Sequence, residues 1–184
     1  GVFSNMIVAE IGLNHLGSIK LLKKYLESAV CVDALTIQIL SNSFFKNKKF
    51  SSFKLTDKIL LDFILEAKNA GYKVGLAIDD YTKVEYFDSS LISFYKILSK
   101  DINNKKLIDS IMKTSAKDIY ISTGMSDLKE LDDIIPSLSI LDSRFKLIHT
   151  QLSNEIEDVN LKAIELMRDR YHLPVAYGHH CVEE

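Results

Sequence analysis

The chain has 184 residues, of which 47% are hydrophobic and 26% are charged, and its formal net charge is −2. A chain of this size forms one domain with a substantial core, and its balanced charge gives no basic field for nucleic acid or an anionic membrane. No apolar run is long enough to cross a bilayer, and no secretion signal opens the sequence. The two cysteines, Cys31 and Cys181, lack metal-type spacing, so we expect a reducing, cytoplasmic environment.

Apolar, β-branched segments alternate along the chain with segments of helical period. Seven segments predict strands, at residues 6–12, 34–40, 73–79, 94–99, 118–123, 146–150 and 174–180. Five segments between them predict helices, at residues 18–30, 56–71, 103–115, 126–138 and 157–171. Ser18 and Thr56 are the expected N-caps of the first two helices, and Gly71 suits the end of the second. Pro136 is expected to end or bend the fourth helix.

This alternation predicts an α/β protein with a parallel sheet covered on both faces. Doubly wound open sheets and (β/α)₈ barrels both fit the pattern. No GxGxxG or GxxxxGK[ST] motif follows the first strand, which weakens a nucleotide-binding open sheet. A barrel needs eight strands, so a barrel built from these seven would lack its eighth strand and would expose the edges of strands one and seven.

Polar side chains stand near the carboxyl ends of several predicted strands. Since side chains alternate between the two faces of a strand, each polar residue shares a face with the residue two positions before it. Buried charges without partners are costly, so several at equivalent heights indicate a shared polar cavity at the barrel's carboxyl-terminal mouth. The polar residues are Glu10, Gln38, Lys96, Ser122 and His180.

A structural explanation of each residue stays open beside this functional one. Glu10 and Lys96 would form an ordinary structural ion pair, and Gln38 and Ser122 would satisfy backbone groups. A lone histidine at a strand end, such as His180, is more often not a metal ligand.

Several stretches, in the order expected, resemble the sialic acid synthase family, N-acetylneuraminate synthase and its relatives. The family's first strand, AEIG followed by NH and G, is similar to VAEIGLNHLGSIKLLKKYLESA. Its fourth strand, FKIAS followed by G and an acidic residue, resembles FYKILSKD, and its STGMS motif occurs in YISTGMSDLKEL. Its HCT segment and EDVNL helix resemble IHTQLSNEIEDVNLKAIELM, and its LPVGYSDHT resembles LPVAYGHHC.

The resemblance implies an α/β protein of the (β/α)₈ TIM-barrel class, with about seven β/α units and the eighth strand missing, in one domain over residues 1–184. It implies the condensation of phosphoenolpyruvate with an N-acylated aldose, typically N-acetylmannosamine, to a sialic acid with release of phosphate. A divalent metal, usually Mn²⁺ with Mg²⁺ or Co²⁺ as alternatives, would polarise the sugar's aldehyde as a Lewis acid. The partners would be these small molecules, with no nucleic acid and no membrane.

The resemblance also assigns roles to single residues. Glu10 takes the carboxylate role near the sugar and the reacting water. Lys96, Ser99 and Ser122 would hold phosphoenolpyruvate, with Lys96 as the cationic anchor.

Four further positions match the family's other site residues. Gln38 would contact the amino sugar, and Asp101 matches the acidic residue that follows the fourth strand. Asn154 matches the family's asparagine in a segment that is about two residues shorter here. His180 falls on a metal-binding histidine.

The sequence departs from the family at positions that bear on catalysis. Thr36 stands where the family has a lysine that contacts phosphoenolpyruvate, Ala77 where it has a phosphate-contacting threonine, and Gly178 where it has a serine. Each lost charge-assisted contact would cost about 1.5–3 kcal/mol. The family's second metal-binding histidine and the small C-terminal domain of its homodimers would both lie beyond Glu184.

Two other functions compete with synthase activity. A degenerate, non-catalytic homologue that binds a sugar, a phosphorylated ligand or a partner protein would explain Thr36, Ala77 and Gly178. A Schiff-base aldolase would use Lys96 as its nucleophile, and this requires a depressed lysine pKa.

Overall fold

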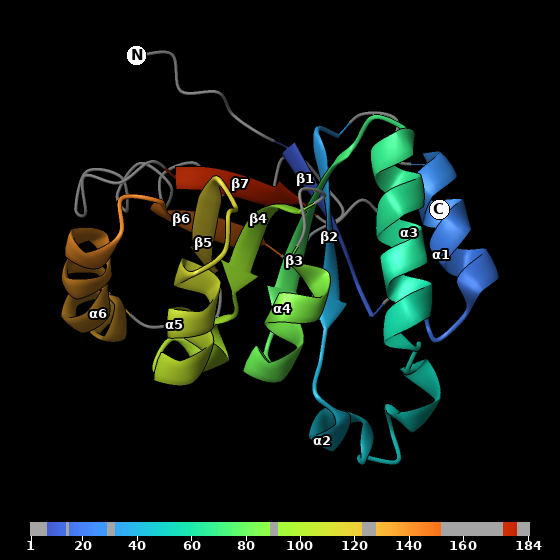
Figure 1. Ribbon diagram of the computed structural model, residues 1–184, viewed down its shortest axis with the longest axis horizontal. Helices are drawn as coiled ribbons and strands as arrows, with labels where there is room; N and C mark the ends of the chain where they lie inside the picture. The colour runs from blue at the N-terminus through green and yellow to red at the C-terminus, as the bar shows by residue number, and fades with distance from the viewer. Residues whose placement is uncertain are drawn as a thin grey trace.

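The computed structural model describes residues 7–13, 15–28, 32–88, 92–122, 128–151 and 175–179. Within these residues, parallel strands form a closed barrel in chain order, with helices outside it (Figure 1). The strands are β1 (Ile7–Gly12), β2 (Ala34–Ile39), β3 (Lys73–Ile78), β4 (Ile92–Ile97), β5 (Asp118–Ser122), β6 (Phe145–Gln151) and β7 (Val175–His179).

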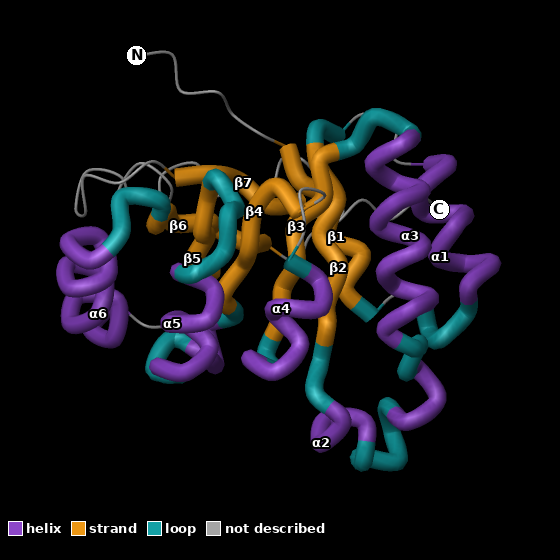
Figure 2. The backbone as a smooth tube through the Cα atoms, in the orientation of Figure 1, coloured by secondary structure: helices purple, strands orange, loops and turns teal. Residues whose placement is uncertain are grey.

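Helices follow most of the strands and lie around the sheet (Figure 2). They are α1 (Ile19–Ser28), α2 (Asn42–Phe45), α3 (Asp57–Asn69), α4 (Val84–Phe87), α5 (Lys105–Met112) and α6 (Leu128–Leu141). Short 3₁₀ turns cover Ser51–Phe53, Tyr81–Lys83 and Ser99–Asp101. The short helices α2 and α4 were not predicted from the sequence, because each is too brief to show a helical period. The helix expected at residues 157–171 lies outside the described residues.

The expected helix ends are confirmed. The hydroxyl of Ser18 accepts a hydrogen bond of 3.2 Å from the backbone amide of Leu21. The hydroxyl of Thr56 accepts one of 3.2 Å from the amide of Ile59 at the start of α3. Gly71 adopts a φ of 96° after α3, a left-handed conformation that favours glycine at this position. These local signals therefore fix where α1 and α3 begin and where α3 ends.

Of the two outcomes expected at Pro136, an end of the helix is wrong, and a bend stays a prediction. Helix α6 runs from Leu128 to Leu141 with Pro136 inside it. A proline in a helix interior removes one backbone hydrogen bond at a cost of about 3 kcal/mol. Leu138, two residues further on, is buried in the core and packs the second half of α6 against the barrel. We attribute the continuation of the helix to this tertiary packing.

The expected open edges at the first and last strands were also wrong. Strand β1 pairs with β7 in parallel register, with Ile7 opposite Tyr177, Val8 opposite Gly178 and Ala9 opposite His179. The backbone donors and acceptors of the two strands therefore satisfy one another, which removes the edges that an open sheet would present. The α/β barrel class itself is confirmed.

The inner face of the barrel is filled by apolar side chains toward its amino-terminal end. Val8, Ala34, Phe94 and Tyr120 form a buried cluster there, and the rings of Phe94 and Tyr120 meet edge to face with centroids 5.3 Å apart. Gly75 leaves the space that Phe94 occupies, since a Cβ at Gly75 would lie 2.0 Å from the ring. The main core lies on the outer face of the strands, under the helices. Two residues further along the same strands, and so on the same face, come Glu10, Thr36, Lys96 and Ser122, toward the carboxyl-terminal half.

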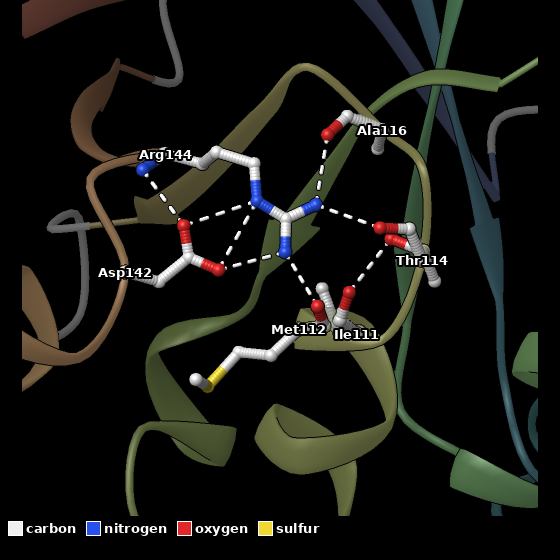
Figure 3. A network of polar contacts seen from close by, with 6 residues as sticks. All are labelled: Ile111, Met112, Thr114, Ala116, Asp142 and Arg144. Atoms are coloured by element: carbon white, nitrogen blue, oxygen red, sulfur yellow. Dashed lines mark hydrogen bonds and ion pairs between the residues drawn. The ribbon is translucent and has the colours of Figure 1, made fainter.

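A network around Arg144 holds the amino-terminal end of β5 and β6 together (Figure 3). The Arg144 guanidinium donates hydrogen bonds to the backbone carbonyls of Met112, Thr114 and Ala116 at 2.5, 2.8 and 2.9 Å. It also pairs with the carboxylate of Asp142 at 2.7 Å, which holds the pKa of Asp142 below its usual value. Arg144 thus joins the α5–β5 connection to the turn that leads into β6.

Candidate active site

A buried ion pair crosses the interior of the barrel. The Nζ atom of Lys96, on β4, contacts the Oε1 atom of Glu10, on β1. The two side chains are only 5% and 8% exposed. Because β1 and β4 are not neighbours in the barrel, the pair must reach across the interior to form. The expectation that the two side chains can pair with each other is confirmed. A shared polar cavity around them stays a prediction.

Burial changes the chemistry of Lys96. Removal of the ammonium group from water disfavours its charged form and lowers the pKa of Lys96 to about 8. The group is therefore mostly a cation at neutral pH but loses its proton more readily than an exposed lysine. A buried cation of this kind attracts carboxylate and phosphate groups strongly, because little water competes with them.

Two of the positions that depart from the family's pattern adjoin this ion pair. Thr36 is the register partner of Glu10, and Ala77 is the register partner of Lys96. Thr36 is 3% exposed, and its hydroxyl oxygen has no hydrogen-bond partner in the structure. A buried hydroxyl without a hydrogen-bond partner lowers the stability of the fold by about 1–3 kcal/mol. A ligand in the barrel that forms a hydrogen bond with this oxygen would remove that cost.

Ser122 and Gln38 belong to the same inner face. Ser122 is buried at the end of β5, two residues beyond Tyr120, which is the register partner of Lys96. Gln38 is half-buried near the end of β2, opposite Ala77. The structure therefore brings both predicted residues to the carboxyl-terminal half of the interior, around the Glu10–Lys96 pair.

The predicted residues Ser99 and Asp101 lie in the 3₁₀ turn after β4, at the mouth of the barrel. The Nζ atom of Lys100 contacts Oδ2 of Asp101 at 3.3 Å and Oδ2 of Asp79 at 3.0 Å. Asp79 in turn accepts a hydrogen bond of 2.7 Å from the backbone amide of Ser41. This network joins the carboxyl ends of β2, β3 and β4. Sequence reasoning missed Asp79, the last residue of a predicted strand, and Lys100, which directly follows the predicted site residue Ser99.

Two predicted residues, Asn154 and His180, lie outside the described residues, so their roles stay predictions. Within the described part of the chain, no group of three or more His, Cys, Asp or Glu side chains is arranged to hold a metal ion. Strand β7 ends at His179, whose backbone pairs with Ala9, the residue before Glu10.

A pocket that sequence reasoning did not predict lies beside the barrel mouth. It is built from the segments that follow β1, β2 and β3 and contains Gln38 and His15. His15 is 2% exposed, and its Nδ1 atom accepts a hydrogen bond of 2.9 Å from the amide of Gly17. Burial lowers the pKa of His15, so the ring is neutral at physiological pH. Most of the wall is apolar and comes from Leu13, Leu40, Phe45, Phe53, Leu55 and Leu60.

An α/β barrel with ionisable side chains buried at the carboxyl-terminal half of its interior has the architecture of a TIM-barrel enzyme. The family model described as NeuB family matches residues 46–183. The chain therefore belongs to the NeuB family, and the resemblance to the sialic acid synthases is confirmed.

Two relatives illustrate how far the chain has diverged. It is 30% identical over 185 residues to an uncharacterized protein of Methanocaldococcus jannaschii, and the match covers 95% of this chain and 55% of the relative. It is 28% identical over 205 residues to the N,N'-diacetyllegionaminic acid synthase of Campylobacter jejuni, covering 95% of this chain and 60% of that enzyme. The chain thus spans little more than half the length of these relatives.

Solved structures share the fold. The N-acetylneuraminic acid synthetase of Leptospira borgpetersenii superposes with a TM-score of 0.78 at 22% identity, over 96% of this chain and 65% of that one. A putative spore coat polysaccharide biosynthesis protein E of Chromobacterium violaceum gives a TM-score of 0.75 at 19% identity, over 95% and 58%. These similarities support the (β/α)₈-type barrel. No helix among the described residues is both long and apolar enough to span a membrane.

Proposed function

We propose that this chain condenses phosphoenolpyruvate with an N-acylated aldose of the N-acetylmannosamine type. The product is a sialic-acid-type nonulosonic acid, and inorganic phosphate leaves. The observation that carries the proposal is the buried Glu10–Lys96 pair that crosses the barrel of a NeuB-family member. Relatives named as diacetyllegionaminic acid synthases support a sugar acid as the product.

In this proposal Lys96 binds the phosphate or carboxylate of phosphoenolpyruvate. The substrate anion competes with Glu10 for the lysine, because both are negative groups and Lys96 is buried beside the carboxylate. The hydroxyls of Ser99, Ser122 and Thr36 add hydrogen bonds to the bound anion. Thr36 is suited to this role because its buried hydroxyl has no partner in the structure.

When the substrate anion displaces Glu10 from Lys96, the Glu10 carboxylate remains beside the reacting centre. The enol carbon of phosphoenolpyruvate attacks the sugar aldehyde, and the aldehyde oxygen takes up a proton. Water then adds to the phosphate-bearing carbon, and Glu10 accepts the proton that this water loses. The resulting tetrahedral carbon expels phosphate and becomes the ketone of the product. Gln38 and Asn154 contact the sugar, and Asp101 helps to shape the mouth.

A divalent metal, Mn²⁺ or alternatively Mg²⁺ or Co²⁺, belongs to the proposal through the family resemblance, with His180 as a ligand. Such an ion supplies Lewis-acid polarisation of the aldehyde oxygen. Within the described ranges no three ligand side chains are grouped, so His180 is the one residue that the proposal assigns to the ion. A cytoplasmic location and a homodimer are likewise proposals that rest on the sequence.

The test is phosphate release from phosphoenolpyruvate in the presence of N-acetylmannosamine and Mn²⁺. We expect release to require both sugar and metal, and to be abolished by chelation and by His180→Ala. Lys96→Met should also abolish it. Lys146→Met is the matched control, because Lys146 forms an ion pair with Asp118 at the amino-terminal end of the barrel. No release from folded protein with any N-acylated sugar would refute the proposal.

One observation favours a non-catalytic homologue as the second candidate. The positions that have lost phosphate contacts, Thr36 and Ala77, adjoin Glu10 and Lys96 directly, so the loss falls at the centre of the site. Calorimetry separates the two candidates, since a non-catalytic homologue would bind phosphoenolpyruvate or the sugar without releasing phosphate.

The lowered pKa of Lys96, about 8, also meets the condition for a Schiff-base aldolase. In that chemistry the neutral amine attacks a substrate carbonyl and water leaves, which forms an imine. Borohydride would reduce the imine to a stable secondary amine, and mass spectrometry would show the added mass on Lys96. An unmodified Lys96 after treatment with pyruvate and borohydride would exclude this third candidate.

A further inference from the structure

Lys100 departs from the fourth-strand motif of the family, in which a glycine follows the serine. Here the serine is kept as Ser99, and the lysine after it has a side chain that is 55% exposed. A single exposed ion pair would contribute little. The ammonium group of Lys100, however, lies 3.0 Å from Oδ2 of Asp79 and 3.3 Å from Oδ2 of Asp101. Lys100 therefore joins two carboxylates at the mouth of the barrel.

Asp79 is the fixed partner in this bridge. Its side chain is only 6% exposed. Its Oδ1 atom accepts a hydrogen bond of 2.7 Å from the backbone amide of Ser41, and its own amide donates one of 3.3 Å to the carbonyl of Ile39. Asp79 is thus attached to the end of β2 through both its side chain and its backbone. The carboxylate that Lys100 contacts therefore has a defined position in the barrel.

The turn that carries Ser99 is held from its other side by the core. The backbone amide of Asp101 donates a hydrogen bond of 2.8 Å to the carbonyl of Leu98, at the end of β4. The residue after the turn, Ile102, is 3% exposed and packs in the main core. Lys100 adds a contact from this turn to β3, and half-buried Ser99 lies at the start of the turn.

Electrostatics makes the position of this turn depend on Lys100. The carboxylates of Asp79 and Asp101 lie close together, because each is within 3.3 Å of the same ammonium group. Without that cation the two negative groups would repel each other. Asp79 is attached to β2, so the repulsion would displace the turn that contains Asp101. Ser99 belongs to the same turn and would move with it.

We propose that Lys100 is a positioning residue, which bridges two carboxylates and thereby fixes the turn that presents the Ser99 hydroxyl to the substrate anion. The inference rests on the proposed function, since it concerns the binding of phosphoenolpyruvate. Lys100 acts through Ser99 and does not itself contact the anion, because its ammonium group is occupied by Asp79 and Asp101.

The departures at Thr36 and Ala77 make such a device useful. A lysine and a threonine that would contact phosphoenolpyruvate in the family are replaced at these two positions. Binding of the anion then depends more strongly on the contacts that remain, and Ser99 is one of them. A hydroxyl that is already held in place loses less conformational freedom when the anion binds, which favours binding.

The experiment is a double-mutant cycle on the whole chain, with binding of phosphoenolpyruvate measured by calorimetry. We expect Ser99→Ala and Lys100→Met each to weaken binding about tenfold, because each removes one hydrogen bond to a charged ligand group. The double variant should also be about tenfold weaker, since both changes remove the same contact. Lys100→Arg should keep most of the affinity, because a guanidinium can also bridge two carboxylates.

Lys83→Met is the matched control. Lys83 lies in the turn that follows β3 and pairs with Asp57 at 3.1 Å, so its replacement also removes one paired positive charge. It should bind phosphoenolpyruvate like the wild type. Hydrogen exchange at the backbone amide of Asp101 should be faster in Lys100→Met and unchanged in Lys83→Met.

The inference is overturned if the losses from Lys100→Met and Ser99→Ala add, or if folded Lys100→Met binds like the wild type. It is also overturned if the folded wild type does not bind phosphoenolpyruvate. Binding that follows the expected cycle without any phosphate release would support the inference and refute the proposed function. Phosphate release and binding that Lys100→Met leaves unchanged would support the proposed function and refute the inference.

Discussion

The two ends of the barrel hold their charged groups in opposite ways. At the amino-terminal end, Lys146 pairs with Asp118, and the two side chains are 27% and 29% exposed. Arg144 at the same end donates to three backbone carbonyls and a carboxylate. In the carboxyl-terminal half of the interior, the Glu10–Lys96 pair is almost fully buried and Thr36 beside it has an unpaired hydroxyl.

This difference separates stabilising groups from groups available to a ligand. Charges that are partly hydrated and fully paired hold loops and strands together at little desolvation cost. A buried ion pair is weak evidence for stability, because desolvation of both charges offsets their attraction. In the proposed function Glu10 and Lys96 serve ligand binding, while the amino-terminal network holds the fold together.

Replacement of Lys96 should produce the largest effect. Lys96→Met removes the cation beside the buried Glu10 carboxylate and should lower the free energy of unfolding by about 3–5 kcal/mol. Lys146→Met should lower it by about 1 kcal/mol or less, because that pair is partly exposed. Urea denaturation measures both values. The double variant Glu10→Leu with Lys96→Met should recover most of the stability that Lys96→Met loses. Equal losses in Lys96→Met and Lys146→Met would contradict the difference between the two ends of the barrel.

Replacement of Arg144 should separate stability from activity. Arg144→Met removes the donors to three carbonyls that water can partly reach, so we expect a loss of about 2–3 kcal/mol. Phosphate release per folded molecule should stay at the wild-type level. A loss of activity without a loss of stability would show that the amino-terminal end also serves the reaction.

The lowered pKa of Asp142 gives the Arg144 network a pH dependence. The folded-state pKa lies below the ordinary value of 3.8, so the stabilisation is present above that pH and is lost as the pH falls through the lowered pKa. Wild type and Arg144→Met should therefore approach each other in stability under acid conditions, as thermal unfolding can show.

The pKa of Lys96 predicts how the binding of phosphoenolpyruvate depends on pH. The lysine is a cation below about pH 8 and neutral above it. Binding of the anion should thus be strong at pH 7 and about tenfold weaker at pH 9, in proportion to the protonated fraction. Calorimetry at several pH values checks this, and Lys96→Met should bind weakly at every pH. Wild-type binding that does not change with pH would show that phosphoenolpyruvate binds away from Lys96.

Thr36→Val should give the smallest effect, and one of opposite sign. Valine has nearly the shape of threonine and removes an unpaired buried hydroxyl, so we expect a gain of about 1 kcal/mol in unfolding free energy. The same change should weaken phosphoenolpyruvate binding several-fold, because the hydroxyl is then lost to the ligand. A destabilised variant would mean that the hydroxyl has a structural partner in the folded chain.

Much of the fold follows from local patterns in the sequence. The alternation of strand and helix periods predicted an α/β protein with a parallel sheet, while the barrel came from the family resemblance. Ser18, Thr56 and Gly71 marked helix ends correctly. Local patterns could not decide whether Pro136 ends its helix, because the packing of Leu138 against the core was not visible in them. Asp79, whose partners Ser41 and Lys100 are distant in the sequence, was missed for the same reason.

The sequence by itself determined which side chains face the interior of the barrel, because a period of two assigns each residue of a strand to one face. It thereby placed Glu10, Gln38, Lys96 and Ser122 on the inner face. Only the tertiary structure decided that β1 pairs with β7, that Glu10 meets Lys96 across the interior and that a pocket forms around His15. These contacts join residues that are far apart in the sequence. Whether such residues meet depends on how all the strands close into the barrel.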